Sequence, residues 1–207
     1  MDRRRFLLLS LAASGSLTIG RGFLAPAFAT SVRPGESPYG PLLAPDANGL
    51  KVPEGFRVRV IKRSGLPIGD TGEIAMSFPD GAATFPPPVN ITDPTGVGID
   101  GLGGVQAIRF RPDGSIADAY TILRGSRSNC AGGVTPWGTW LSCEEVDDPL
   151  DAANSGRVFE CDPTGKRPAV DRPAMGRFSH ENAAVDPVDR RIYLTEDQGD
   201  GFLYRFT

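Results

Sequence analysis

The residues best suited to chemistry lie in one segment, Ser128 to Glu145, which reads SNCAGGVTPWGTWLSCEE. Asn129, Cys130 and a glutamate at the end of this segment are plausible metal ligands, because a thiolate suits a softer ion and carboxylates suit a harder one. The alternative is a glycine-rich turn before a buried strand that ends in solvated acids. Composition alone does not separate these two interpretations.

The same segment is predicted to begin as a loop and to end as a strand. Residues that disfavour a helix and permit tight turns occupy its first part: Gly132, Gly133, Pro136 and Gly138. Residues 137–143 favour β-structure, and we expect Trp137, Trp140 and Leu141 to pack together in the interior. Successive strand residues point to opposite faces, so Glu144 and Glu145 must face opposite ways. Glu144 is expected to face solvent or to pair with an arginine.

The segment resembles the signature of the PhoX-type bacterial alkaline phosphatases, a family of exported proteins. Two later blocks, residues 176–187 (GRFSHENAAVDP) and 192–206, also resemble that family. The resemblance covers residues 104–207 well and the earlier chain loosely. It implies a β-propeller with iron and calcium in a central site, which hydrolyses phosphate esters.

The residues that could hold these metals lie in or beside the blocks that carry the resemblance. The ends of propeller strands open onto a central channel, so carboxylates there can converge from several blades. The predicted ligands are Cys130, Glu145, Glu181 and Glu196, with Asp197 as a further ligand or as a partner of one. His180 is either an interior side chain or part of this site.

Composition supports a metal site and disfavours other classes of function. Lys and Arg total 22 and Asp and Glu total 25, and no basic stripe is present, so nucleic-acid binding is disfavoured. An acidic protein that acts on phosphate esters needs cations in its site. With one histidine, a polyhistidine zinc site is excluded. The chain contains neither a Walker-type phosphate loop nor a Gly-x-Ser-x-Gly elbow.

The three cysteines permit at most one disulfide within the chain. Metal ligation would occupy the thiol of Cys130. Cys143 and Cys161 lie in apolar strands and are expected to be small buried residues.

The N-terminus has the features of a twin-arginine signal peptide. Arg3 and Arg4 precede an apolar region at residues 7–19, and Ala27-Phe28-Ala29 is a cleavage site. A transmembrane anchor is disfavoured because the apolar run is short and interrupted by serine and glycine. We therefore expect the twin-arginine machinery to export the chain to the periplasm or beyond, with residues 1–29 removed and no stable membrane anchor.

The rest of the sequence predicts an all-β fold. A recurring unit of strand, Asp/Arg-Pro turn and strand occurs at three places, 105–123, 157–165 and 182–195, and is typical of propeller blades. A β-sandwich would give similar strands. Residues 30–56 are expected to form an extended arm, and the first strand is expected at 57–61.

Residues 57–207 are predicted to form an incomplete β-propeller. At roughly 40–50 residues per blade they provide about three to four blades. Residues 79–104 are rich in Gly, Pro and Asp and are expected to hold no strand longer than a few residues. Here the sequence departs from the family, whose strand in this region brings an asparagine and a glutamate toward the site. The chain also ends within an apparent strand at 203–207, which indicates the N-terminal portion of a longer protein.

Two functions from different classes are consistent with these features. The first is an exported metal-dependent phosphatase that hydrolyses phosphate monoesters, with weak or no activity for this chain alone. The second is a non-catalytic propeller that binds a partner or small ligand. We expect a monomer in either case.

Overall fold

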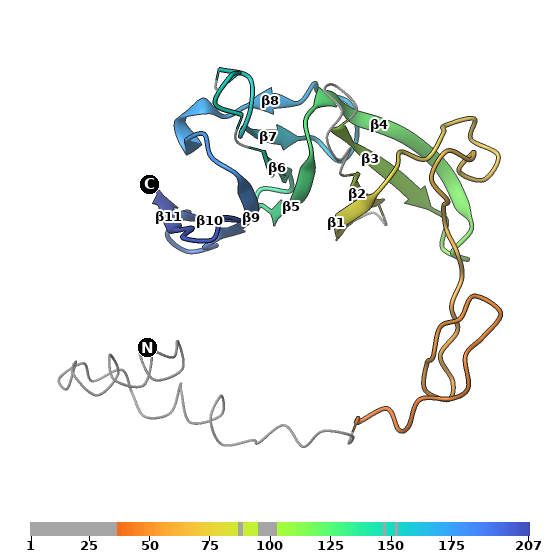
Figure 1. The fold of residues 1–207 in the computed structure, drawn as a ribbon. Helices are drawn as coiled ribbons and strands as arrows, with labels where there is room; N and C mark the ends of the chain where they lie inside the picture. Colours follow the sequence, from red (N-terminus) through yellow and green to blue (C-terminus); the bar gives the residue numbers. More distant parts are fainter. Residues whose placement is uncertain (1–36, 87–88, 95–102, 147, 152) are drawn as a thin grey trace, which may run out of the picture. The chain divides into compact units, whose positions relative to one another are not determined.

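A computed structural model describes residues 37–86, 89–94, 103–146, 148–151 and 153–207 (Figure 1). The predicted signal peptide and the first part of the predicted arm lie outside these residues. The chain divides into two compact units, the first ending at Arg59 and the second spanning Val60–Thr207. No helix in the described part of the chain is both long and apolar enough to cross a bilayer.

In the first unit, residues 37–59 contain little regular structure. Leu42 and Pro53 form an isolated antiparallel bridge, and the rings of Tyr39 and Phe56 meet edge to face with centroids 5.3 Å apart. The strand predicted at 57–61 does not form. An alternating pattern becomes a strand only where a neighbouring strand pairs with its backbone groups, and none of the described strands does so here.

The second unit is all-β, and its described residues form three antiparallel sheets with one short 3-10 turn at Pro173–Met175. The first sheet has the strand order β1 (Pro79–Phe85), β2 (Val89–Pro94), β3 (Gly103–Phe110) and β4 (Ile116–Ser126). The second has the order β5 (Asn129–Val134), β6 (Trp140–Glu144), β7 (Val158–Cys161) and β8 (Val170–Asp171). The third contains β9 (His180–Val185), β10 (Ile192–Glu196) and β11 (Leu203–Phe206), with β10 in the middle.

Two of the predicted loop regions are strands. Residues 79–94 hold β1 and β2, of seven and six residues, because these strands pair with each other and β2 also pairs with β3. The prolines Pro79 and Pro94 stand opposite each other at the ends of the ladder, where a missing N–H is tolerated. Residues 129–134, predicted as a loop, form β5.

The glycines of β5 allow close approach of neighbouring backbones. A Cβ at Gly132 would collide with the carbonyl oxygen of Leu141 in β6, and a Cβ at Gly133 would collide with that of Ala183 in β9. Neither glycine has a positive φ. Glycine is therefore required at these two positions because a Cβ would not fit, and not because the backbone adopts a special conformation. Glycine within a strand therefore marks tight packing here instead of a turn.

The three sheets meet at their first strands. β1 contacts β5, and β5 contacts β9, so β5 lies between the other two (Figure 1). A Cβ at Gly81 in β1 would lie only 2.6 Å from the Cα atom of Ala131 in β5. Small residues at both contacts thus bring the first strand of each sheet against the first strand of the next.

The second sheet has a hydrophobic cluster on each face. Trp140 packs with side chains of the first sheet, including Val105 and Leu123. Leu141 and Cys143 pack with side chains of the third sheet, including Ala183 and Leu194. Because neighbouring strand residues face opposite ways, Trp140 and Leu141 are both buried but belong to different clusters.

Trp137 is 46% exposed, so the prediction that it is buried is wrong. It lies in the turn between β5 and β6, where Gly138 has φ 83°. Its Nε1–H donates a hydrogen bond to Glu160 at 2.6 Å. Cys143 and Cys161 are fully buried, as predicted, and form no disulfide.

Candidate metal centre

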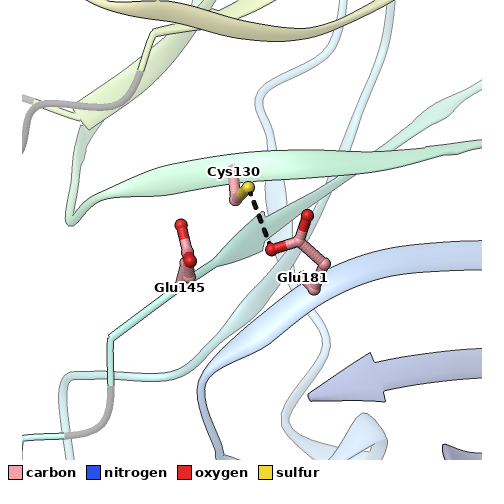
Figure 2. A group of neighbouring side chains, drawn as sticks. All are labelled: Cys130, Glu145 and Glu181. Carbon is pink, nitrogen blue, oxygen red and sulfur yellow. Dashed lines mark hydrogen bonds between the residues drawn. The ribbon is translucent and has the colours of Figure 1, made fainter. Parts of the chain in front are cut away.

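The structure brings together three of the predicted ligands, Cys130, Glu145 and Glu181 (Figure 2). One potential ligand atom from each lies within 4.8 Å of those of the other two. The thiol of Cys130 donates a hydrogen bond to Oε2 of Glu181 at 3.3 Å. Cys130 is buried, and the two glutamates are half-buried. The group is therefore compact and has one side toward solvent.

Two sheets supply these side chains. Cys130 is on β5 and Glu145 directly follows β6; both lie at the same end of this hairpin because Asn129 pairs with Glu144. Glu181 is on β9, which packs against β5. The candidate site is therefore formed by the contact between the second and third sheets.

The adjacent glutamates Glu144 and Glu145 have different environments. The side chain of Glu144 is fully buried and forms an ion pair with Arg157 at 3.3 Å. It also accepts hydrogen bonds from the backbone N–H groups of Arg127 at 2.9 Å and Arg157 at 3.0 Å. The predicted arginine partner is confirmed, but the residue is interior and not solvated. Glu144 thereby holds the backbone just before β5, at Arg127, and just before β7, at Arg157.

Asn129, a candidate ligand by sequence, is engaged within the sheets. Its buried Oδ1 accepts a hydrogen bond from Ser126 Oγ at 2.5 Å. Its Nδ2 donates to Ser142 Oγ at 2.8 Å. The amide therefore fixes the strand that carries Cys130 and is not directed to the metal group.

Burial and neighbouring acidic residues raise the pKa values of the group. Burial, a hydrogen bond with Asp197 and the charges of Glu181 and Asp197 raise the pKa of the Glu145 carboxyl to about 7. Burial also raises the pKa of the Cys130 thiol, and the carboxylates of Glu181 and Glu145 raise it further. A bound cation would favour the charged form of each group. A thiol and several carboxylates at this spacing fit a metal ion.

The other two predicted ligands differ in position. Asp197 lies beside the group, because its side chain hydrogen-bonds to Glu145. Glu196, at the end of β10, accepts hydrogen bonds from the Phe202 N–H at 3.1 Å and the Tyr204 hydroxyl at 3.0 Å. Its carboxylate fastens the β10–β11 hairpin and lies outside the three-residue group.

His180 is an interior side chain. It is completely buried, and its ring lies against that of Phe178 with centroids 3.6 Å apart. Its Nε2 lies 3.4 Å from the Gly176 carbonyl oxygen. Burial lowers the pKa of His180 to about 4, so the imidazole is neutral at physiological pH.

The sequence analysis assigned other roles to the residues that position the site. Glu144, Asn129 and Gly133 each hold the strands that present the three candidate ligands. Two consecutive glycines beside β-favouring residues were a usable signal, because glycine inside a strand indicates close backbone approach.

Fold and site together define a class of protein. It is an all-β protein in which one thiol and two carboxylates meet where two sheets touch. The family model described as "Alkaline phosphatase PhoX" matches residues 91–207. The match covers more than half of the chain and includes all the predicted ligands. The chain belongs to the PhoX alkaline phosphatase family. No curated protein matches it, and no solved structure does either.

Proposed function

We propose that this chain is an exported metal-dependent phosphatase that hydrolyses phosphate monoesters. The observation that carries this proposal is the convergence of Cys130, Glu145 and Glu181 from two sheets. All three residues fall within the part that matches the phosphatase family. Asp197 would assist by holding Glu145. Iron and calcium are the proposed metals, since the thiol suits the softer ion and the carboxylates the harder one.

We also infer that the sheets are blades of a β-propeller. The first two are four-stranded antiparallel sheets whose strands follow chain order, and the first strands of all three meet in sequence. Propeller blades are four-stranded sheets arranged around a central channel. On this plan β1, β5 and β9 are inner strands, and Cys130 and Glu181 lie beside the channel.

The chain's own residues would bind the metal and leave room for the substrate. A metal ion at this site would polarise the phosphoryl group and neutralise charge as it develops. Cys130 and Glu181 would hold it from adjacent strands. Burial and nearby acids raise the pKa of Glu145 to about 7 in the metal-free protein, and a bound cation would favour its ionised form, which could then join them as a ligand. The half-buried carboxylates leave a side from which a small phosphate ester can approach.

The first test is metal analysis of the purified protein, combined with an assay on p-nitrophenyl phosphate. We expect bound iron and calcium, and weak hydrolysis that disappears on dialysis against a chelator and returns when the metals are restored. Hydrolysis is expected to be weak because Glu196 is engaged in the β10–β11 hairpin. Strong hydrolysis that persists without metal would rule out the mechanism.

That position of Glu196 also favours a second candidate, a non-catalytic propeller that binds a small ligand or a partner. The same experiment distinguishes the two functions. Protein that lacks both stoichiometric metal and hydrolytic activity would support the binding module and contradict the phosphatase.

Export can be tested separately at Arg3, Arg4 and Arg5. Replacing all three by lysine should abolish accumulation of the protein in the periplasm, because the twin-arginine signal requires its arginine pair. Immunoblots of periplasmic and cytoplasmic fractions would measure this effect. The matched control replaces Arg33 and Arg57, which lie beyond the predicted cleavage site, by lysine. Undiminished periplasmic accumulation of the triple variant would contradict export by this pathway.

A further inference from the structure

A second polar site lies at the opposite end of β6 from Glu145, beside the β5–β6 turn. It is a cavity of about 70 Å³, and the lining residues relevant here are Thr139, Glu160, Asp162, Arg167, Val170 and Arg172. The cavity therefore combines two carboxylates with two guanidinium groups. Which charges remain available to a ligand depends on how these four groups pair.

Internal hydrogen bonds satisfy Glu160. It accepts from Thr139 Oγ1 and Trp137 Nε1 at 2.6 Å each, and from Arg172 Nε at 2.8 Å and Nη2 at 2.5 Å. Burial alone would raise the pKa of Glu160, but these bonds outweigh it and hold the pKa below its ordinary value. Four donors fill the acceptor capacity of a carboxylate.

Asp162 is satisfied in a similar way. It accepts from the Thr164 N–H at 2.9 Å, from Thr164 Oγ1 at 2.8 Å and from Arg167 Nε at 3.0 Å. Burial opposes ionisation, but these donors hold the pKa of Asp162 below its ordinary value. Both acids of the cavity are thus ionised and have little capacity left for a ligand.

The arginines retain donors. A guanidinium group has five N–H bonds. Within the described part of the chain, Arg167 donates one to Asp162, and Arg172 donates two to Glu160. Their side chains are 71% and 44% exposed. The unused hydrogen-bonding capacity of the cavity therefore consists mainly of guanidinium N–H groups, whose planar arrangement matches carboxylate and phosphate oxygens.

We propose that this cavity binds a small oxyanion, a phosphate or a carboxylate group, through Arg167 and Arg172. Val170 supplies an apolar part of the wall. The site is separate from the Cys130 group and does not depend on the proposed metal chemistry. Its carboxylates position the two arginines and leave their outer N–H groups for the ligand.

The two tryptophans of the chain provide the test. The Trp137 indole shares Glu160 with Arg172, whereas Trp140 is buried in the core. In ¹⁵N-labelled protein titrated with inorganic phosphate, the Trp137 indole N–H signal should shift saturably in the millimolar range, and that of Trp140 should stay fixed. A parallel titration with acetate distinguishes the ligands, since the tighter binder identifies the preferred group.

Arg167→Gln should weaken the binding of that ligand by about tenfold, because one exposed charge-assisted contact is lost. Arg172 is a poorer choice because its loss would strip Glu160 of two donors. Arg109→Gln is the matched control, because Arg109 is 52% exposed and pairs with Asp118 at 3.4 Å on the first sheet. An unchanged Trp140 signal shows that each variant is folded. Absence of a saturable Trp137 shift with either anion, or equal affinity in the two variants, would overturn the proposal.

Discussion

Replacing Glu181 by glutamine should lower the bound metal and the rate of phosphate-monoester hydrolysis together, by ~100-fold or more. Loss of a residue that merely supports a metal ligand already costs about 10–100-fold, and Glu181 is itself a proposed ligand. Its carboxylate lies 3.3 Å from the Cys130 thiol, and a neutral amide cannot balance the charge of a cation. Metal content by mass spectrometry and kcat/KM would be measured on the same samples.

Two further variants make this result specific. Cys130→Ser should produce a similar loss and should affect iron more than calcium, because a hydroxyl is a harder donor than a thiolate. Glu54→Gln applies the same chemical change to an exposed glutamate of the first unit and should leave metal content and rate unchanged. Full metal content in Glu181→Gln and Cys130→Ser would show that the group in Figure 2 is not the metal centre.

Trp140→Ala is expected to give the largest loss of stability, ~3–5 kcal/mol in the free energy of unfolding. The ring is 3% exposed and lies in the cluster between the first and second sheets. Its removal leaves a cavity that the rigid strands around it cannot close. Urea unfolding followed by circular dichroism would measure the effect.

Trp137→Ala is the matched comparison, because it removes the same side chain from an exposed turn. It loses one hydrogen bond to Glu160 and little buried area, so a cost of about 1 kcal/mol is expected. Equal destabilisation by the two substitutions would contradict the packing of the second sheet described above.

Local sequence signals predicted the hairpins well. The strands at 105–123 and 182–195 pair as expected, because each connecting turn is encoded by residues next to one another in the chain. In the first hairpin, Gly114 adopts φ 80° and Asp113 accepts a hydrogen bond from the Ser115 N–H. Such turns need no information from distant residues.

Long-range contacts decided the features that sequence reasoning missed. Residues 129–134 look like a turn, yet they form a strand that pairs with β6 and packs closely against β9. Trp137 has the residue type of a core side chain, but it lies in a turn and is 46% exposed. These outcomes depend on neighbours that are remote in sequence, which local propensity does not reveal.

In the candidate site, too, local sequence signals predicted some features, and contacts between distant residues decided others. Spacing at strand ends, together with the family resemblance, predicted Cys130, Glu145 and Glu181 as ligands, and the structure places their side chains close together. Glu196 had an equivalent position at the end of a strand. The Phe202 N–H and the Tyr204 hydroxyl engage its carboxylate instead, and that competition was not visible in the pattern.

Because the three candidate ligands come from two different sheets, a metal bound by them would link these sheets in addition to taking part in the reaction. Cys130 lies in the second sheet, Glu145 directly follows strand β6 of that sheet, and Glu181 lies in the third. None of the three cysteines forms a disulfide. An ion that bridges these sheets would act as a disulfide does, by opposing their separation. Because only the docked sheets form the site, free metal at 100 times its Kd would add about 2.7 kcal/mol to the stability of that arrangement. The concentration of free metal would then affect how stably the second and third sheets stay docked.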